Sequence, residues 1–150
     1  MAFSFGFFDS RGLDRTYTAE DFTSYLSNLI CNGILDTYGD CFKVTANENL
    51  TVTIGTGKAW IGGHYFINDS AYTLDLSRYV DESMSKYLII GIYCDTSDAV
   101  RKCDIEVKVG TAATSPAIPS FTNSHTRTYL NAAMSGAFLA SARCRKCLTK

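Results

Sequence analysis

The amino-acid sequence predicts a mostly β domain of the α+β class, an antiparallel β-sandwich or β-roll with one amphipathic helix near the N-terminus. Two patterns lead to this prediction. Apolar residues recur at three- and four-residue spacing in one early segment, and they alternate with polar residues in several segments from residue 50 onward. With 150 residues, 46% of them hydrophobic, the chain is long enough to bury a single core.

The helix is predicted over Thr18 to Asn32. Its apolar residues fall on one helical face, namely Phe22, Tyr25, Leu26, Leu29 and Ile30. Thr18 can cap the start, and Glu20 and Asp21 place negative charge at the positive end of the helix dipole. Asn32-Gly33 then supplies a C-terminal stop.

Strands are predicted where the apolar period changes to two. Residues 50–54 and 72–76 alternate in this way, and Gly55-Thr56-Gly57 turns the chain between the first of these strands and the next segment. Residues 58–61 and 64–67 flank Gly62-Gly63, which is typical of a tight hairpin. Trp60 lies in this hairpin and is predicted to anchor the core, so that Trp60→Ala would cost on the order of 3–5 kcal/mol.

A second hairpin is predicted further along the chain. Residues 86–94 contain a continuous apolar run, which favours a central strand covered on both faces, although a short buried helix also fits. Residues 101–109 alternate most clearly, with four apolar side chains on one face, Cys103, Ile105, Val107 and Val109. We expect the two segments to pair antiparallel across the turn at 95–98.

The rest of the chain is divided by composition. Residues 110–126 hold both prolines and are predicted to form an extended surface connection, whereas 129–139 fit either a last strand or a short helix. We therefore expect an N-terminal apolar arm at 1–17, a single β-rich domain with its leading helix at 18–140, and a basic, frayed tail at 141–150.

The arm is the most apolar part of the chain. It carries four large side chains in eight residues, Phe3, Phe5, Phe7 and Phe8. Leaving them in water would be costly, so we expect them to dock on a partner protein or, alternatively, on the chain's own domain.

Charge and hydropathy exclude several classes of partner. Charged residues make up 19% of the chain and sum to −1, so nucleic acid is not an expected partner. No apolar run approaches the ~20 residues of a membrane span, and the N-terminus lacks a basic leader, so we expect no membrane insertion and folding in a cytoplasm. The six cysteines are accordingly expected to be reduced thiols.

No residue pattern identifies a catalytic, cofactor or metal site. His64 and His125 stand apart from other candidate ligands, and Cys144 and Cys147 have CxxC spacing without a second ligand pair. The carboxylates have structural explanations, in a mixed-sign strand face and at the helix start. Trp60, Tyr65 and Phe66 could stack on sugars if exposed, which leaves a carbohydrate-binding module as an alternative and a small hydrolase as a second one.

A set of short motifs occurs in a suggestive order. The chain has Phe7-Phe8-Asp9-Ser10, Tyr17 to Phe22, Asn32-Gly33-Ile34 and Leu50-Thr51-Val52, followed by Gly57 to Tyr65. Further on, Lys108-Val109-Gly110-Thr111 leads to Pro116. Over about residues 3 to 130 the chain resembles the N-terminal domain of upper baseplate or receptor-binding tail proteins of phages and prophages of Gram-positive bacteria.

This resemblance implies a non-catalytic structural domain in a virion tail baseplate, assembled in the bacterial cytoplasm. Such a domain docks onto the tail hub and onto neighbouring copies of itself, so the implied partners are other tail proteins in a homo-oligomeric arrangement. It implies no cofactor. After Leu130 the sequence departs from the family, whose members continue into another strand.

Overall fold

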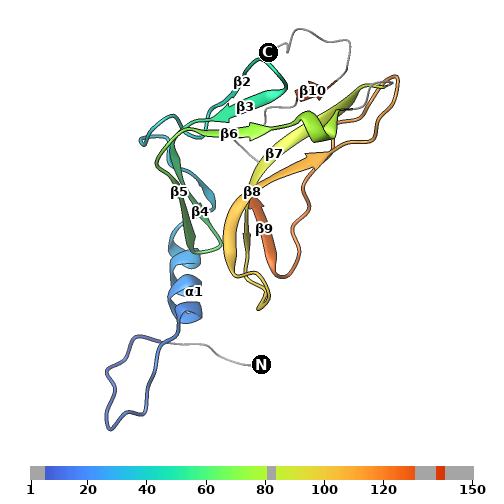
Figure 1. The fold of residues 1–150 in the computed structure, drawn as a ribbon. Helices are drawn as coiled ribbons and strands as arrows, with labels where there is room; N and C mark the ends of the chain where they lie inside the picture. The colour runs from blue at the N-terminus through green and yellow to red at the C-terminus, as the bar shows by residue number, and fades with distance from the viewer. Residues whose placement is uncertain (1–5, 81–83, 131–137, 141–150) are drawn as a thin grey trace.

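The structure is a computed structural model that describes residues 6–80, 84–130 and 138–140. It confirms the predicted fold class, because far more residues lie in strands than in helices and one α-helix lies near the N-terminus (Figure 1). The helices are α1 (Ala19–Leu29) and η1 (Ser77–Tyr79), a single 3-10 turn. The strands are β1 (Gly33–Ile34), β2 (Val44–Ala46), β3 (Thr51–Ile54), β4 (Gly57–Ile61), β5 (His64–Asn68), β6 (Tyr72–Asp75), β7 (Lys86–Asp95), β8 (Lys102–Val109), β9 (Arg127–Leu130) and β10 (Phe138–Ala140).

The strands form three small antiparallel sheets, ordered β1-β4-β5, β2-β3-β6 and β10-β7-β8, with β9 also pairing with β7. Both predicted hairpins are confirmed. In the first, Ile61 pairs with His64 across Gly62-Gly63, and both glycines have positive φ as the tight turn requires. In the second, Leu88 pairs with Val109 and Asp95 with Lys102.

β7 is the central strand that its continuous apolar run predicts. It pairs with β8 along one edge, and with β9 and β10 at opposite ends of the other edge. For residues 129–139 the sequence allowed either a strand or a short helix, and the described part of this segment is strand, at Tyr129–Leu130 of β9 and in β10. Residues 131–137 lie outside the described part of the chain. The predicted tail at 141–150, with Cys144 and Cys147, also lies outside the described residues.

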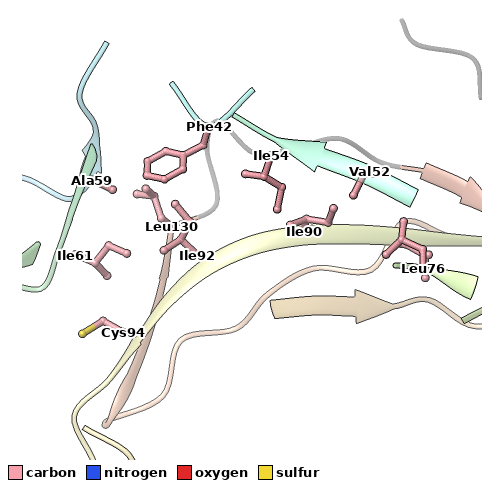
Figure 2. Packing of buried hydrophobic residues seen from close by; sticks show 11 residues of the cluster. Phe42, Val52, Ile54, Ala59, Ile61, Leu76, Ile90, Ile92, Cys94 and Leu130 are labelled. Atoms are coloured by element: carbon pink, nitrogen blue, oxygen red, sulfur yellow. The ribbon is translucent and has the colours of Figure 1, made fainter. Parts of the chain in front are cut away.

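One core joins the three sheets. Figure 2 shows side chains from β3, β4, β7 and β9 converging on it. Its buried members among the described residues are Phe42, Val52, Ile54, Ala59, Ile61, Leu76, Leu88, Ile90, Ile92, Cys94 and Leu130. The β1-β4-β5 and β2-β3-β6 sheets thus share a core with the β7–β8 hairpin.

Trp60 is not the core anchor that we predicted. In β4 the core-facing positions are Gly57, Ala59 and Ile61, so alternation turns Trp60 to the opposite face, where it is half-buried. Phe42 is instead the large aromatic side chain that anchors the core. It is fully buried in the loop before β2, and its ring stacks on Phe66 with centroids 5.7 Å apart.

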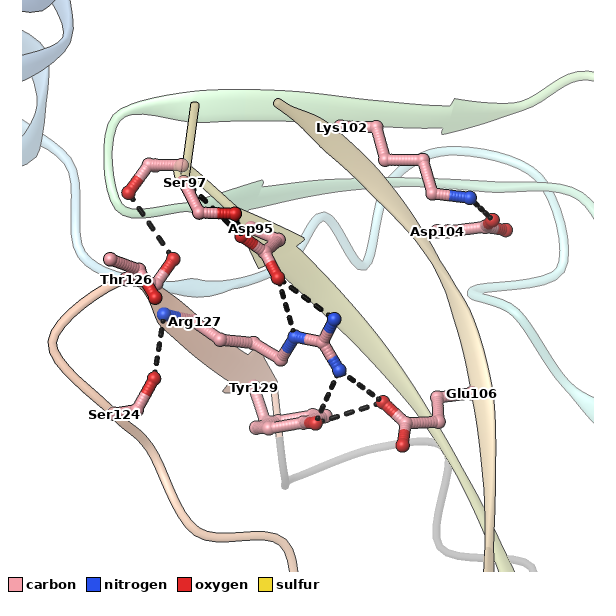
Figure 3. A network of polar contacts seen from close by, with 10 residues as sticks. Asp95, Ser97, Lys102, Asp104, Glu106, Ser124, Thr126, Arg127 and Tyr129 are labelled. Atoms are coloured by element: carbon pink, nitrogen blue, oxygen red, sulfur yellow. Dashed lines mark hydrogen bonds and ion pairs between the residues drawn. The ribbon is translucent and has the colours of Figure 1, made fainter. Parts of the chain in front are cut away.

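A polar network fixes β9 against the β7–β8 hairpin (Figure 3). Arg127 Nε and Nη2 each lie 2.8 Å from Asp95 Oδ2, and Nη1 lies 3.2 Å from Glu106 Oε2. The Tyr129 hydroxyl donates to the same Glu106 oxygen at 2.8 Å. Charge-assisted hydrogen bonds of this kind bridge the three strands through one guanidinium.

Candidate functional site

Helix α1 begins where its capping chemistry predicts. The Thr18 hydroxyl accepts a hydrogen bond from the Asp21 amide at 3.4 Å, and the Asp21 carboxylate accepts one from the Thr18 amide at 2.7 Å. These contacts, the backbone one first, lower the pKa of Asp21. The helix ends at Leu29, three residues before the predicted end, because Ile30 is already extended.

The apolar side of α1 is exposed, although an amphipathic pattern normally indicates a helix side that is buried against a core. None of its residues is buried, and Phe22, Tyr25 and Leu29 are 51%, 48% and 63% exposed. In Figure 1, α1 extends from the end of the β4–β5 hairpin, away from the β2-β3-β6 sheet. The amphipathic pattern predicted the helix correctly, but the apolar side of this helix is not covered by the core.

The described part of the N-terminal arm adds to this face. The Phe7 ring lies 5.4, 5.6 and 4.8 Å from the ring centroids of Tyr17, Phe22 and Tyr25. The Tyr17 hydroxyl accepts from the Phe8 amide at 2.6 Å and donates to its carbonyl at 3.0 Å. The arm is thereby fastened to its own helix at Phe7 and Phe8, whereas Phe3 and Phe5 lie outside the described residues.

We call the surface formed by Phe7, Phe8, Phe22, Tyr25 and Leu29 the aromatic face. All five side chains stay about half exposed or more, although the Phe7 ring packs on Phe22 and Tyr25. Aromatic side chains of this size normally contribute to cores and interfaces, and clustered ones on a surface are typical of interaction sites.

A groove of about 1130 Å³ lies beside this helix. α1 forms one wall with Phe22 and Leu26, the β4–β5 hairpin forms another with Trp60 and Tyr65, and the end of the β7–β8 hairpin contributes Arg101 and Lys102. The Trp60 and Tyr65 rings lie 6.5 Å apart at an angle of 75°. They meet edge to face and do not form a flat platform.

The close approach of α1 to the β4–β5 turn sets the geometry of the groove. A Cβ at Gly63 would lie 2.0 Å from the Thr23 carbonyl oxygen, so only glycine fits against the helix at this point. Asn32 Oδ1 also accepts a hydrogen bond from the Gly62 amide at 2.7 Å. The helix backbone thus lies directly against the turn of the hairpin, and Asn32, just after the helix, is hydrogen-bonded to that turn.

The charged groups of the β7–β9 region are engaged with one another. Asp95 Oδ1 accepts from the Ser97 hydroxyl at 2.6 Å and Oδ2 accepts from Arg127. The Ser97 hydrogen bonds, followed by those from Arg127, lower the pKa of Asp95. Burial raises the pKa of the Tyr129 hydroxyl, which donates to Glu106. These carboxylates therefore hold the three strands together through Arg127 and Tyr129.

His64 lies at the rim of the groove, with Nδ1 3.1 Å from the Gly62 carbonyl oxygen. His125 lies on the distant connection before β9. Across residues 6–80, 84–130 and 138–140, no group of three or more His, Cys, Asp or Glu side chains is placed to hold a metal ion. No helix in this described part of the chain is long and apolar enough to cross a membrane.

Comparisons with protein-family models, with curated proteins and with solved structures found no match to this chain. The resemblance to phage tail proteins therefore depends on the order of the sequence motifs alone. The sequence predicted the two parts of the aromatic face but not their contact with each other. The Phe-rich arm and the helical period were both apparent, but their mutual packing through Phe7 and Tyr17 was not.

Proposed function

We propose that this chain is a non-catalytic structural domain of a phage or prophage tail baseplate, which docks onto the tail hub and onto neighbouring copies. The observation that carries the proposal is the aromatic face, an apolar helix side that the chain's own core leaves uncovered. The order of the sequence motifs supports a tail baseplate as the assembly to which the chain docks. Docking accounts for both features together.

The free energy available from this face is sufficient for assembly. Fully burying one large apolar side chain contributes roughly 1.5–3 kcal/mol, and the five side chains of the aromatic face have about half of their surface left to bury. Because Phe7 and Phe8 are already fastened by Tyr17, a partner would not need to order that segment anew.

Tyr25→Ala tests the proposal against a matched control. Tyr25 and Tyr72 are both 48% exposed, but Tyr72 lies on β6, outside the aromatic face. We expect Tyr25→Ala to weaken binding of the purified chain to a purified hub protein from the same gene cluster by about tenfold or more, at ~1.4 kcal/mol per tenfold, and Tyr72→Ala to leave it unchanged.

Titration calorimetry gives the two dissociation constants, and light scattering gives the mass of the free chain and of the complex. Equal dissociation constants for the two variants would contradict docking through the aromatic face. If the wild-type chain binds none of the tail proteins encoded beside it, the baseplate assignment itself is wrong.

A carbohydrate-binding module is the second candidate, because Trp60 is not buried in the core but lines the groove together with Tyr65. This function ranks behind docking because the Trp60 and Tyr65 rings meet at 75°, whereas a sugar-stacking platform needs coplanar rings. A glycan array with the intact chain distinguishes the two functions. Sugar binding that Trp60→Ala abolishes and Tyr25→Ala spares would favour the module.

A further inference from the structure

Two cysteines face each other across the second hairpin. Cys94 on β7 and Cys103 on β8 are direct register partners, flanked by the pairs Tyr93–Asp104 and Asp95–Lys102. Both thiols are free. Because register partners on antiparallel strands project to the same face, the strand pairing itself holds the two sulfur atoms together.

The strand spacing suits a disulfide. Directly opposed residues of an antiparallel pair have Cα atoms about 4.5 or 5.5 Å apart, depending on the hydrogen-bonding pattern. Disulfides usually join Cα atoms about 4.4–6.8 Å apart, so the Cα spacing of either kind of position falls within the range of a disulfide. The two side chains also influence each other's pKa, as expected for facing register partners.

The cysteine pair lies between the buried core and the groove beside α1. Cys94 is 4% exposed and belongs to the core cluster (Figure 2). Cys103 is half-buried, and both residues contribute to the wall of the groove beside α1.

The two thiols differ in acidity. The hydrogen bond from Cys103 lowers the pKa of Cys94, against opposing effects of burial and of the Asp95 charge. The same hydrogen bond, together with burial, raises the pKa of Cys103. The thiolate is the reactive form of a cysteine, and the contact between the two side chains favours it at Cys94.

We propose that Cys94 and Cys103 are a peroxide-sensitive thiol pair that closes into a reversible cross-strand disulfide. The Cys94 thiolate attacks one oxygen of hydrogen peroxide, which yields a sulfenic acid and, after proton uptake, one water. Cys103 sulfur then attacks Cys94 sulfur and displaces the hydroxyl group, which leaves with the Cys103 proton as a second water. In total two thiols are oxidised to one disulfide, and one peroxide is reduced to two waters.

The disulfide would tie β7 to β8 where the hairpin borders the groove. Thr96 and Arg101 in the adjoining turn, and Lys102 at the start of β8, line the same groove. Oxidation would thus fix the wall that faces α1. This inference does not depend on the proposed assembly function, since it concerns the isolated chain.

The test is peptide mass mapping of the intact chain. The reduced protein is treated with hydrogen peroxide, its remaining thiols are alkylated, and it is digested without reductant. We expect a Cys94–Cys103 linked peptide lighter by two hydrogens, with Cys31 still alkylated, and loss of the link on adding dithiothreitol. The same treatment in urea should give mixed pairings, because the strand register no longer selects the partners. Absence of the Cys94–Cys103 peptide from the folded protein would overturn the proposal.

Variants identify the order of the two steps. In Cys103→Ser the sulfenic acid has no resolving thiol, so we expect dimedone to label Cys94, whereas Cys31→Ser should form the disulfide as the wild type does. Dimedone labelling at Cys31 in place of Cys94 would contradict the assigned role of Cys94. The wild-type mapping stands independently if Cys103→Ser does not fold.

Discussion

At the scale of single residues, alternation decides more than side-chain size. Trp60 is the largest side chain of its strand, yet the buried positions of β4 are Gly57, Ala59 and Ile61. Gly57 has to be small because a Cβ there would lie 2.6 Å from the Phe42 ring. The phase of the strand is thus set by Phe42, a residue of a distant loop, and a local pattern could not reveal it.

Gly63 offers a residue-scale prediction with a matched control. Both Gly62 and Gly63 have positive φ, but only a Cβ at Gly63 would meet the Thr23 carbonyl, whereas nothing lies within 4 Å of one at Gly62. We expect Gly63→Ala to lower the free energy of unfolding by roughly 1–3 kcal/mol more than Gly62→Ala does, because the helix must move away.

Urea unfolding measures this difference. Trp60 is the only tryptophan and lines the groove beside α1, so its fluorescence should shift to the red in Gly63→Ala alone. Identical spectra and stabilities for the two variants would show that the helix does not depend on this close approach.

Asp95 offers a prediction on pH. Hydrogen bonds from Ser97 and Arg127 lower the pKa of Asp95 in the folded state. Its stabilising contribution is therefore complete above the unfolded-state pKa of ~3.9 and is lost as the pH falls through the folded-state value. We expect Asp95→Asn to be less stable than the wild type at neutral pH and to lose less stability than the wild type does on acidification.

Thermal denaturation followed by circular dichroism, from about pH 5 downward, measures both slopes. Asp98→Asn is the control, because Asp98 is exposed in the same turn. A wild-type slope equal to that of Asp95→Asn would contradict the assigned contribution.

At the scale of elements, the sequence predicts what is local and misses what is distant. Both hairpins, and the start of α1 at its Thr18 cap, follow from turn and capping chemistry within a few residues. β1 and β2 are only two and three residues long, too short to show a period. The pairing of β3 with β6 spans the β4–β5 hairpin, so it depends on tertiary packing that no local pattern encodes.

The N-terminal arm gives the prediction at this scale. Phe7 packs on α1, and no residue of α1 is buried, so the arm contributes little to the core. We expect deletion of Met1 to Phe8 to weaken self-association or hub binding while leaving the melting temperature nearly unchanged. Light scattering and scanning calorimetry measure the two quantities. If the deletion unfolds the chain without altering assembly of the part that stays folded, the arm belongs to the core.

At the scale of the whole molecule, the three antiparallel sheets share one set of buried side chains. β3 and β4 are consecutive along the chain but belong to different sheets, and Gly55-Thr56-Gly57 turns the chain between them. Asp40 and Thr56 hold this crossing, with the Asp40 amide donating to the Thr56 carbonyl at 2.9 Å. The loop that contains Asp40 also brings Phe42 over Gly57, in the middle of the core.

Phe42 is therefore the residue on which the joining of the sheets most depends. It is fully buried, it stacks on Phe66 of β5, and it fills the space above Gly57 of β4. Removing its ring would leave a cavity where the sheets meet, so we expect Phe42→Ala to cost about 3–5 kcal/mol. Trp60→Ala should cost less, because Trp60 is half-buried and lies outside the core cluster.

Urea denaturation followed by circular dichroism suits both variants, since it does not need the tryptophan signal. Phe42→Leu is the conservative control, because it keeps most of the buried volume and should recover more than half of the lost stability. Because Phe42 belongs to the one buried cluster to which all three sheets contribute, the Phe42→Ala transition should remain a single step at a lower midpoint. A greater loss for Trp60→Ala than for Phe42→Ala would place the anchor of the core on β4, and the shared core described for Phe42 would be wrong.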